Sequence, residues 1–591
     1  METKHYYTDE RNAQIVIALL KAHGIRRVIA NPGTTNIAFV GSVQNDPWFQ
    51  VYSGVDERHS AYMAVGMAQE SGEPVVLSCT GATASRNYLP ALTEAYYRKL
   101  PILALTSIHR LGSLGNLLPQ MLDRSVQPRD TVRYSVQIPT PHTLAEINDC
   151  VLNVNKAILE LRRSGGGPVH INLETSRIST FNTKELPPVR VIKRVVASDN
   201  HWPVLDSERR VGVWIGAHKK FSRETVAAIE NFVKHFNAAV FVDHTSSYYG
   251  FGRVNAAFVS GQHGMHFNPK YRHLLPQLQI QLGEISGDYF TMGLCSAATD
   301  TWRVNEDGEL RDLNGKLSHV FAMTEGEFFG HYNGLAGEER QPRYYLDWMS
   351  ADEALRKRPV DFPFSNLWMA MCAHDRFPAG SIVHLGIFNS FRSWIQFRLP
   401  EGVQANCNVG GFGIDGSIST LIGASLVRPD KIFFAVVGDL AFFYDLNALG
   451  NRHIGRNIRI LLVNNGCGAE FKLSSHYGSQ FGSQTDDYIA AGHHFGNKSP
   501  DLVRHFASDL GFKYLTASTK EEFIGQLDEF FAPKCDASIV FECFTSPENE
   551  SAALELLSRI DPYVSVKGRV KNVLSSCLPD EMVSMIGKIF K

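Results

Sequence analysis

Two short polar motifs could together hold a metal ion and a diphosphate. Gly438-Asp439 directly follows the apolar residues Val436-Val437, and Asn464-Asn465 directly follows another apolar run at 460 to 463. If both runs are neighbouring strands of one parallel sheet, the carboxylate and the amide lie side by side at its carboxyl edge. Magnesium prefers oxygen ligands and is often held by one or two protein oxygens plus phosphates. Three such oxygen ligands would come from the Asp439 carboxylate, the side chain of Asn465 and the backbone of Cys467. The alternative is a Gly-Asp turn and a polar strand end in a sheet that holds no cofactor.

Alternating helix and strand signals in the first third of the chain predict the sheet that such motifs need. Apolar residues at helical spacing over 12–23 end at Gly24, a residue typical of a helix C-terminus, and a buried strand is predicted at 27–30. The later predicted elements are strands at 51–55, 74–79 and 102–106 and helices at 56–68 and 85–98. This alternation predicts a parallel, doubly wound sheet.

The rest of the chain repeats this plan. A polar, proline-bearing stretch at 180–197 is interpreted as a linker, and a charged, turn-rich insertion is expected around 304–314. The predicted fold class is α/β, with three doubly wound parallel-sheet domains and a helical C-terminal tail. The predicted bounds are 1–180, 198–345 and 360–550 for the three domains and 551–591 for the tail.

Composition narrows the class of protein. The 591 residues carry 58 Lys and Arg against 60 Asp and Glu, so no basic excess is available to neutralise nucleic acid. The nine cysteines are scattered and never spaced as C-x-x-C, which favours a reducing compartment over a disulfide framework or a zinc cluster. No apolar run is long enough for a membrane span, and the N-terminus lacks a signal-peptide pattern. We expect a cytoplasmic protein whose partners are neither nucleic acid nor membrane.

The chain resembles the thiamine-diphosphate enzymes that decarboxylate 2-oxo acids or join carbon fragments. The resemblance is carried by Gly438-Asp439 with Asn464-Asn465, by Gly413-Ile414-Asp415-Gly416, by Thr80-Gly81-Ala82, and by Leu440 in place of a third glycine. Within this family the pattern is most similar to the 2-succinyl-5-enolpyruvyl-6-hydroxy-3-cyclohexene-1-carboxylate synthases of the menaquinone pathway. It implies thiamine diphosphate and Mg²⁺ as cofactors, a pyrimidine-binding N-terminal domain and a diphosphate-binding C-terminal domain.

The resemblance also implies roles for particular residues. Glu57 matches the family glutamate that hydrogen-bonds the aminopyrimidine ring and activates the cofactor, Gln120 matches a glutamine near the reacting centre, and Ile414 matches the apolar residue that bends the cofactor. The alternatives are an acid that favours a helix start, a surface amide and a core residue. The residues implied to contact the cofactor are Glu57, Thr80, Gly413, Ile414, Gly438, Asp439, Leu440 and Asn465.

In this family the glutamate and the metal site come from different subunits. The resemblance therefore implies a homodimer or a homotetramer whose active sites lie at the subunit interface. Four histidines (His59, His109, His384 and His453) could relay protons, but each is more simply interpreted as a polar or capping residue.

Three positions depart from the synthase pattern. At the positions where those enzymes bind acidic substrates through arginines, this chain has Thr35, Val409 and Trp394. Arg110 and Arg392 lie nearby in the sequence and could still bind one carboxylate, although Arg392 could equally form an ion pair. The candidate substrate contacts are Thr35, Arg110, Arg392 and Trp394. Because an arginine fork both attracts and orients a carboxylate, these replacements predict a smaller or less acidic acceptor.

We therefore expect an enzyme, a transferase or lyase, that depends on thiamine diphosphate and Mg²⁺. It would decarboxylate a small 2-oxo acid and transfer the acyl anion to an acceptor, with formation of a carbon–carbon bond. The alternatives are a simple 2-oxo acid decarboxylase, an acetolactate-synthase-like enzyme, and a non-catalytic protein of the same fold. The middle domain has no Gly-x-Gly-x-x-Gly motif that would indicate FAD, and a FAD requirement stays open.

Overall fold

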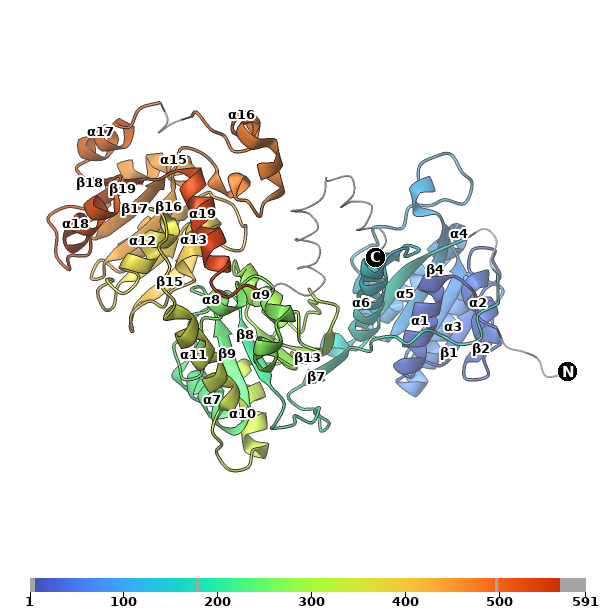
Figure 1. Ribbon diagram of the computed structural model, residues 1–591. Coiled ribbons are helices and arrows are strands. Elements are labelled where there is room, and N and C mark those ends of the chain that lie inside the picture. The colour runs from blue at the N-terminus through green and yellow to red at the C-terminus, as the bar shows by residue number, and fades with distance from the viewer. Residues whose placement is uncertain (1–5, 177–179, 495–497, 564–591) are drawn as a thin grey trace, which may run out of the picture. The chain divides into compact units, whose positions relative to one another are not determined.

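The computed structural model describes residues 6–176, 180–494 and 498–563, which divide into two compact units (Figure 1). Unit 1 runs to Asp199 and includes Glu306–Ala322, and unit 2 comprises Asn200–Asn305 and the residues from Met323 onward. Among the described residues, no helix is both long and apolar enough to cross a membrane. The predicted domain bounds stay predictions.

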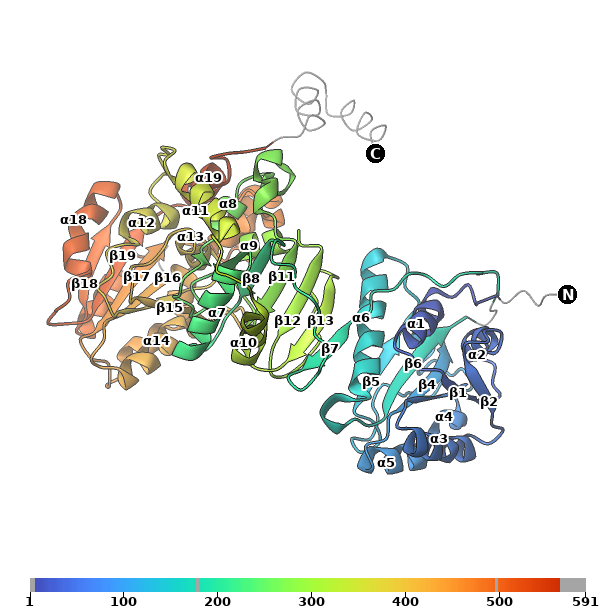
Figure 2. The same cartoon turned by 90° about the horizontal axis from the view of Figure 1, so that it is seen from below.

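Unit 1 is built on a parallel sheet of six strands in the order β2-β1-β3-β4-β6-β5. Its strands are β1 (Arg27–Ala30), β2 (Gln50–Ser53), β3 (Val75–Thr80), β4 (Ile102–His109), β5 (Tyr134–Ile138) and β6 (Val169–Thr175). The helices α1 (Arg11–Ala22), α2 (Ile37–Gln44) and α6 (Leu144–Glu160) cover one face, and α3 (Glu57–Ser71), α4 (Thr83–Asn87) and α5 (Leu89–Tyr97) cover the other (Figure 2). A further parallel pair in unit 1 joins β7 (Lys193–Val196) to β13 (Leu317–Ala322).

Alternate residues of the central strands explain the two helical layers of unit 1. Val76 and Leu103 belong to the core beneath α1 and α6, whereas Val75 and Leu77 belong to the core beneath α3 and α5. Since successive side chains of a strand point to opposite faces, a strand with no polar alternation must be covered on both sides. The expectation of a doubly wound parallel sheet is confirmed.

Two local expectations for unit 1 are wrong. The helix predicted at 85–98 is divided into α4 and α5, with Pro90 in the first turn of α5. Proline has no N–H for a helix interior and is favoured in a first turn, so a new helix begins there. The stretch at 180–197, predicted to be a linker throughout, contains β7.

Unit 2 begins with five parallel strands in the order β10-β9-β8-β11-β12. They are β8 (Val211–Ile215), β9 (Ala238–Val242), β10 (Arg253–Val254), β11 (Leu278–Leu282) and β12 (Asp300–Val304). The helices that follow or connect them are α7 (Arg223–His235), α8 (Ala257–Ser260), α9 (Tyr289–Cys295), α10 (Glu325–Leu335) and α11 (Arg343–Arg356).

The second sheet of unit 2 has six parallel strands in the order β15-β14-β16-β17-β19-β18. They are β14 (Ile382–Leu385), β15 (Gln404–Cys407), β16 (Phe433–Gly438), β17 (Ile458–Asn464), β18 (Lys513–Ala517) and β19 (Ile539–Phe544). Its helices are α12 (Asn366–Ala373), α13 (Asn389–Trp394), α14 (Ser417–Val427), α15 (Asp439–Tyr444), α16 (Thr485–Tyr488), α17 (Leu502–Asp509), α18 (Lys520–Phe530) and α19 (Pro547–Ser558). Alternation again separates two cores, with Phe434 and Val436 in one and Phe433 and Val437 in the other. The predicted helical tail begins with α19, and residues 564–591 lie outside the described part.

A buried carboxylate on α19 joins this helix to the body of unit 2. Glu550 is 1% exposed and accepts hydrogen bonds from the backbone N–H of Asn366 (3.0 and 3.2 Å), the amide of Asn389 (2.8 Å) and the hydroxyl of Thr545 (2.9 Å). Burial raises its pKa. These donors lie at the starts of α12 and α13 and at the end of β19, so one side chain connects three elements.

A second buried carboxylate makes the stability of unit 2 depend on pH. Asp288 caps α9, and burial, with the charge of Asp243 adding to the effect, raises its pKa to about 7. A carboxyl group with a raised pKa binds its proton more tightly in the folded state, so its contribution to stability falls as pH rises from about 4 to about 7. We expect Asp288→Asn to raise the free energy of unfolding at pH 8 by about 2–4 kcal/mol and to flatten its pH dependence. Urea unfolding at pH 5 and pH 8 measures this, with the exposed Asp347→Asn as control; an unchanged slope would contradict it.

Candidate active site

Asp439 and Asn465 lie at the same carboxyl edge of the second sheet of unit 2. Asp439 begins α15 directly after β16, Asn465 follows β17, and these strands are neighbours with Gly438 opposite Val463. Asp439 is 4% exposed as a residue, and its carboxylate accepts backbone hydrogen bonds from Leu440 and Gly466 and has no ion-pair partner in the described part of the chain. Burial raises its pKa to about 7. A buried carboxylate of this kind fits the role of a metal ligand, because a bound cation would offset its charge.

The other oxygens of this edge complete a donor set for a hard cation. The side-chain oxygen of Asn465 accepts a 3.4 Å hydrogen bond from the Cys467 N–H, and the Cys467 carbonyl accepts one of 2.9 Å from Ala469. The Cys467 thiol is buried, which raises its pKa to about 12 and leaves it neutral. A carboxylate, an amide oxygen and a peptide oxygen fit Mg²⁺, and none is a soft ligand.

Glu542 and Tyr514 support this edge, and sequence reasoning gave them no role. Glu542, buried on β19, accepts hydrogen bonds from the Asn464 amide (2.7 Å) and the Tyr514 hydroxyl (2.8 Å). The Asn464 side-chain oxygen in turn accepts the Gly466 N–H (3.2 Å). The two residues therefore fix the turn that carries Asn465. An acidic residue inside the apolar strand 539–544 is the signal that could have identified Glu542.

The Gly413–Gly416 motif leads into α14 beside α15. Ser419 in the first turn of α14 donates from its N–H (2.6 Å) and its hydroxyl (2.5 Å) to Asp445, which ends α15. Ile414 is half-buried and packs against the core that α14 and α15 share. The motif and Gly438–Leu440 are thus held together within unit 2.

In unit 1, Glu57 is the first residue of α3, and Asp56 caps this helix by accepting the His59 N–H at 2.8 Å. The approach to the helix is fixed by Asn31, whose amide donates to the Gly54 carbonyl (2.7 Å) and whose oxygen accepts from Tyr88 (2.7 Å). The Glu57 side chain is partly exposed. The sequence therefore places an acid at a rigidly supported helix start with its carboxylate accessible.

Gly54 is required by this support. A Cβ added there would lie 1.9 Å from the Ser60 Oγ and 3.0 Å from the Ser60 Cβ. We expect Gly54→Ala to lower the free energy of unfolding by about 1–3 kcal/mol, because the helix start must move. The control is Gly66→Ala in α3, where no atom lies within 4 Å of the added Cβ and alanine favours the helix. Thermal unfolding of both variants tests this expectation, and equal melting temperatures for Gly54→Ala and Gly66→Ala would refute the steric argument.

Thr35 and Thr80 meet at the carboxyl edge of the unit 1 sheet. The Thr35 hydroxyl lies 2.7 Å from that of Thr80 and donates to the Ser107 carbonyl at 2.8 Å. Arg124, a residue with no role in the sequence interpretation, is 2% exposed and donates to the Gly81 carbonyl and to Asn172. Arg124 thereby fixes the turn after Thr80.

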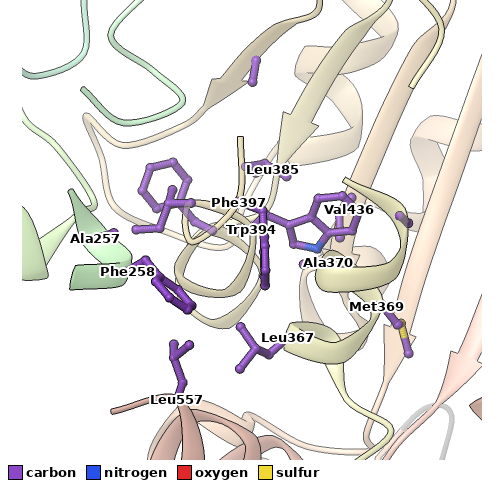
Figure 3. Packing of buried hydrophobic residues seen from close by; sticks show 14 of the residues in the cluster. Ala257, Phe258, Leu367, Met369, Ala370, Leu385, Trp394, Phe397, Val436 and Leu557 are labelled. Carbon is purple, nitrogen blue, oxygen red and sulfur yellow. The ribbon is translucent and has the colours of Figure 1, made fainter. Parts of the chain in front are cut away.

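The remaining candidates are dispersed. Arg110 and Gln120 are exposed in the loop between β4 and β5, with positive φ angles of 27° and 65°. Arg392 makes a two-pronged ion pair with Glu470 (2.5 and 2.8 Å), which realises the ion-pair alternative. Trp394 is fully buried in the core, surrounded by residues such as Leu385, Phe397 and Val436 (Figure 3), and its indole N–H donates to Asn366 at 2.9 Å. Its burial argues for a packing role and against contact with a substrate.

Comparisons with known proteins agree with this geometry. Residues 11–127 match the thiamine pyrophosphate enzyme N-terminal TPP binding domain, and residues 391–543 match the C-terminal TPP binding domain. A 2-succinyl-5-enolpyruvyl-6-hydroxy-3-cyclohexene-1-carboxylate synthase of Bacteroides fragilis is 30% identical over 93% of this chain and 98% of its own length. The chain belongs to the thiamine-pyrophosphate enzymes. Synthases with the same name from Bacteroides thetaiotaomicron and Flavobacterium johnsoniae are 28% and 26% identical, over 93% and 90% of this chain and 98% and 96% of their own lengths.

Membership of this family confirms four expectations: the resemblance, the α/β fold, the enzyme class and thiamine diphosphate as cofactor. The chain is therefore a thiamine-diphosphate-dependent enzyme, similar over nearly its whole length to proteins named as synthases. The roles assigned to individual residues stay predictions.

Proposed function

We propose that this enzyme joins the fragment of a decarboxylated 2-oxo acid to an acceptor that carries fewer carboxylates than the substrates of the named synthases. The product named for those relatives contains a succinyl group, an enolpyruvyl group and a cyclohexene carboxylate, and so three acidic groups. The observation that carries the proposal is the state of two replaced positions, Thr35 and Trp394, and of the nearby Arg392. The Thr35 hydroxyl is bonded within the protein, Trp394 lies in the core, and the charge of Arg392 is offset by Glu470.

Each candidate site residue of this chain has a proposed role in the reaction. When bound, thiamine diphosphate supplies the electron sink for decarboxylation. Asp439, Asn465 and the Cys467 carbonyl would hold Mg²⁺ at the diphosphate site. Glu57 would act as the acid–base group for the pyrimidine ring, and Ile414 would present an apolar surface to the cofactor. Gln120 would act near the reacting centre, and Arg110 would supply a cation for one substrate carboxylate.

We also propose a homodimer or homotetramer with active sites at the subunit interface, located in the cytoplasm. Apolar side chains are unusually exposed around Glu57, with Val55 at 80%, Tyr62 at 48% and Tyr52 at 38%. Such a patch is typical of a surface that another subunit covers. The described cysteines are all free, which suits a reducing compartment.

The test is CO₂ release from a panel of 2-oxo acids: pyruvate, 2-oxoglutarate, phosphonopyruvate and branched-chain acids. Each acid is assayed with and without thiamine diphosphate and Mg²⁺, and with acceptors that carry one or several carboxylates. We expect release that needs both cofactors and is accelerated by an acceptor with one carboxylate or none. A preference for an acceptor with several carboxylates would refute the proposal, and rapid release without any acceptor would favour the simple decarboxylase.

A further inference from the structure

Two arginines without acidic partners face one cleft of unit 2. The cleft measures about 480 Å³ and is lined by the segment Tyr249–Arg253, by Tyr345, and by Arg398 with residues 401–404. Arg253 lies at the start of β10, and Arg398 lies in the loop between α13 and β15. This volume is within the range of small-molecule sites in proteins.

The two guanidinium groups differ from most of the other half-buried arginines that the structure describes. Seven of these pair with an aspartate or glutamate, namely Arg27, Arg163, Arg190, Arg194, Arg209, Arg356 and Arg392. Arg11 and Arg210 instead donate to neutral oxygens. Within the described residues, the Arg253 side chain has no hydrogen bond or ion pair, and its guanidinium lies 5.7 Å from the centre of the Tyr249 ring. Arg398 donates to the Met349 sulfur at 3.0 Å and likewise has no carboxylate partner there.

The positive charges of Arg253 and Arg398 lie close enough to repel each other. Burial lowers the pKa of Arg253, and the positive charge of Arg398 is the next largest cause. The one carboxylate that lines the cleft is Glu401, which is exposed and pairs with neither arginine. The nearby Asp243 is already bonded to Ser286 and Thr245. Two partly desolvated cations with no counterion form a site that an anion would stabilise.

We propose that the cleft between Arg253 and Arg398 binds a small organic dianion, either a phosphate ester or a dicarboxylate. Each guanidinium presents a planar fork that matches the oxygens of such a group. The exposed rings of Tyr249 and Phe251, with Tyr345 lying 5.2 Å from Phe251 between ring centres, supply an apolar wall for the organic part.

This site is distinct from the metal site. Gln404 begins β15 at the amino edge of its sheet, whereas Asp439 follows β16 at the carboxyl edge. The inference therefore does not depend on the proposed function, and a ligand in the cleft would act at a distance from the reacting centre.

Calorimetric titration tests the proposal on protein saturated with thiamine diphosphate and Mg²⁺, which fills the diphosphate site. The probes are inorganic phosphate, glycerol phosphate and succinate in chloride buffer of constant ionic strength. We expect saturable binding of at least one probe with Kd below about 1 mM, weakened at least tenfold by Arg253→Gln and by Arg398→Gln. Binding of the phosphates alone or of succinate alone identifies the class of ligand.

The exposed Arg272→Gln should bind as the unaltered protein does, and thermal unfolding checks that the three single variants and the double variant are folded. Binding that survives in the Arg253→Gln, Arg398→Gln double variant would overturn the proposal. So would the absence of saturable binding by every probe.

Discussion

Replacing Glu57 by glutamine should lower the rate of cofactor-dependent CO₂ release by about 10²- to 10⁴-fold, the range typical of a lost acid–base group. Glutamine keeps the size and one hydrogen-bond acceptor of glutamate but cannot share a proton with the pyrimidine ring. Because Glu57 is partly exposed at the start of α3 and the capping contact comes from Asp56, the fold should be unaffected. The measurement is kcat with saturating thiamine diphosphate, together with the melting temperature.

The matched control is Glu70→Gln, an exposed glutamate near the other end of the same helix. Its kcat should equal that of the unaltered enzyme. If Glu57→Gln retains more than about a tenth of the rate, the proton-sharing role is refuted, since even modest acid–base catalysis exceeds tenfold.

Replacing Asp439 by asparagine should have opposite effects on the free protein and on cofactor binding. At pH 8 the Asp439 carboxylate, whose pKa is raised to about 7 by burial, is ionised without a cation partner among the described residues. Asparagine removes this charge, so the cofactor-free variant should be more stable by about 2–4 kcal/mol. The gain should shrink as pH falls from about 7 and disappear below about 4, where the carboxyl group becomes protonated in the unfolded state as well as in the folded state.

In contrast, Asp439→Asn should weaken binding of thiamine diphosphate in the presence of Mg²⁺ by more than about 100-fold, because an anionic metal ligand is lost. Melting temperatures with and without the two cofactors report both effects at once. The exposed Asp430→Asn is the control and should show neither. A variant that is less stable in the free form and still gains stability from the cofactors would contradict the assignment of Asp439 as a metal ligand.

The sequence was sufficient to predict the parallel sheets, because their strands are continuous apolar runs bounded by turns. It also predicted that Asp439 and Asn465 share one edge, since the position of a residue at a strand end is a local property. It could not predict that Glu542 supports Asn464, or that Arg124 holds the Gly81 turn, because those contacts join residues 78 and 43 positions apart. Packing of this kind follows from tertiary structure alone.

The same limit explains why two of the predicted substrate contacts, Trp394 and Arg392, have other roles in the structure. Trp394 and Arg392 were candidate substrate contacts because of their positions in the sequence, yet α13 carries Trp394 into the core and brings Arg392 to Glu470. Spacing along a helix gives the relative direction of two side chains but not which direction faces the core.

The hydrogen bonds of Glu550 also affect how the chain folds during its synthesis. The starts of α12 and α13 depend on an acceptor that lies 184 and 161 residues later, and β17 lies between β16 and the late strand β19 in its sheet. A nascent chain released from the ribosome up to residue 540 would expose the Asn366 N–H and one side of β17. Unit 1, apart from Glu306–Ala322, has its own sheet by residue 175. Synthesis from the N-terminus should therefore yield an early folded unit 1 and a unit 2 that needs chaperone protection until its last helix emerges.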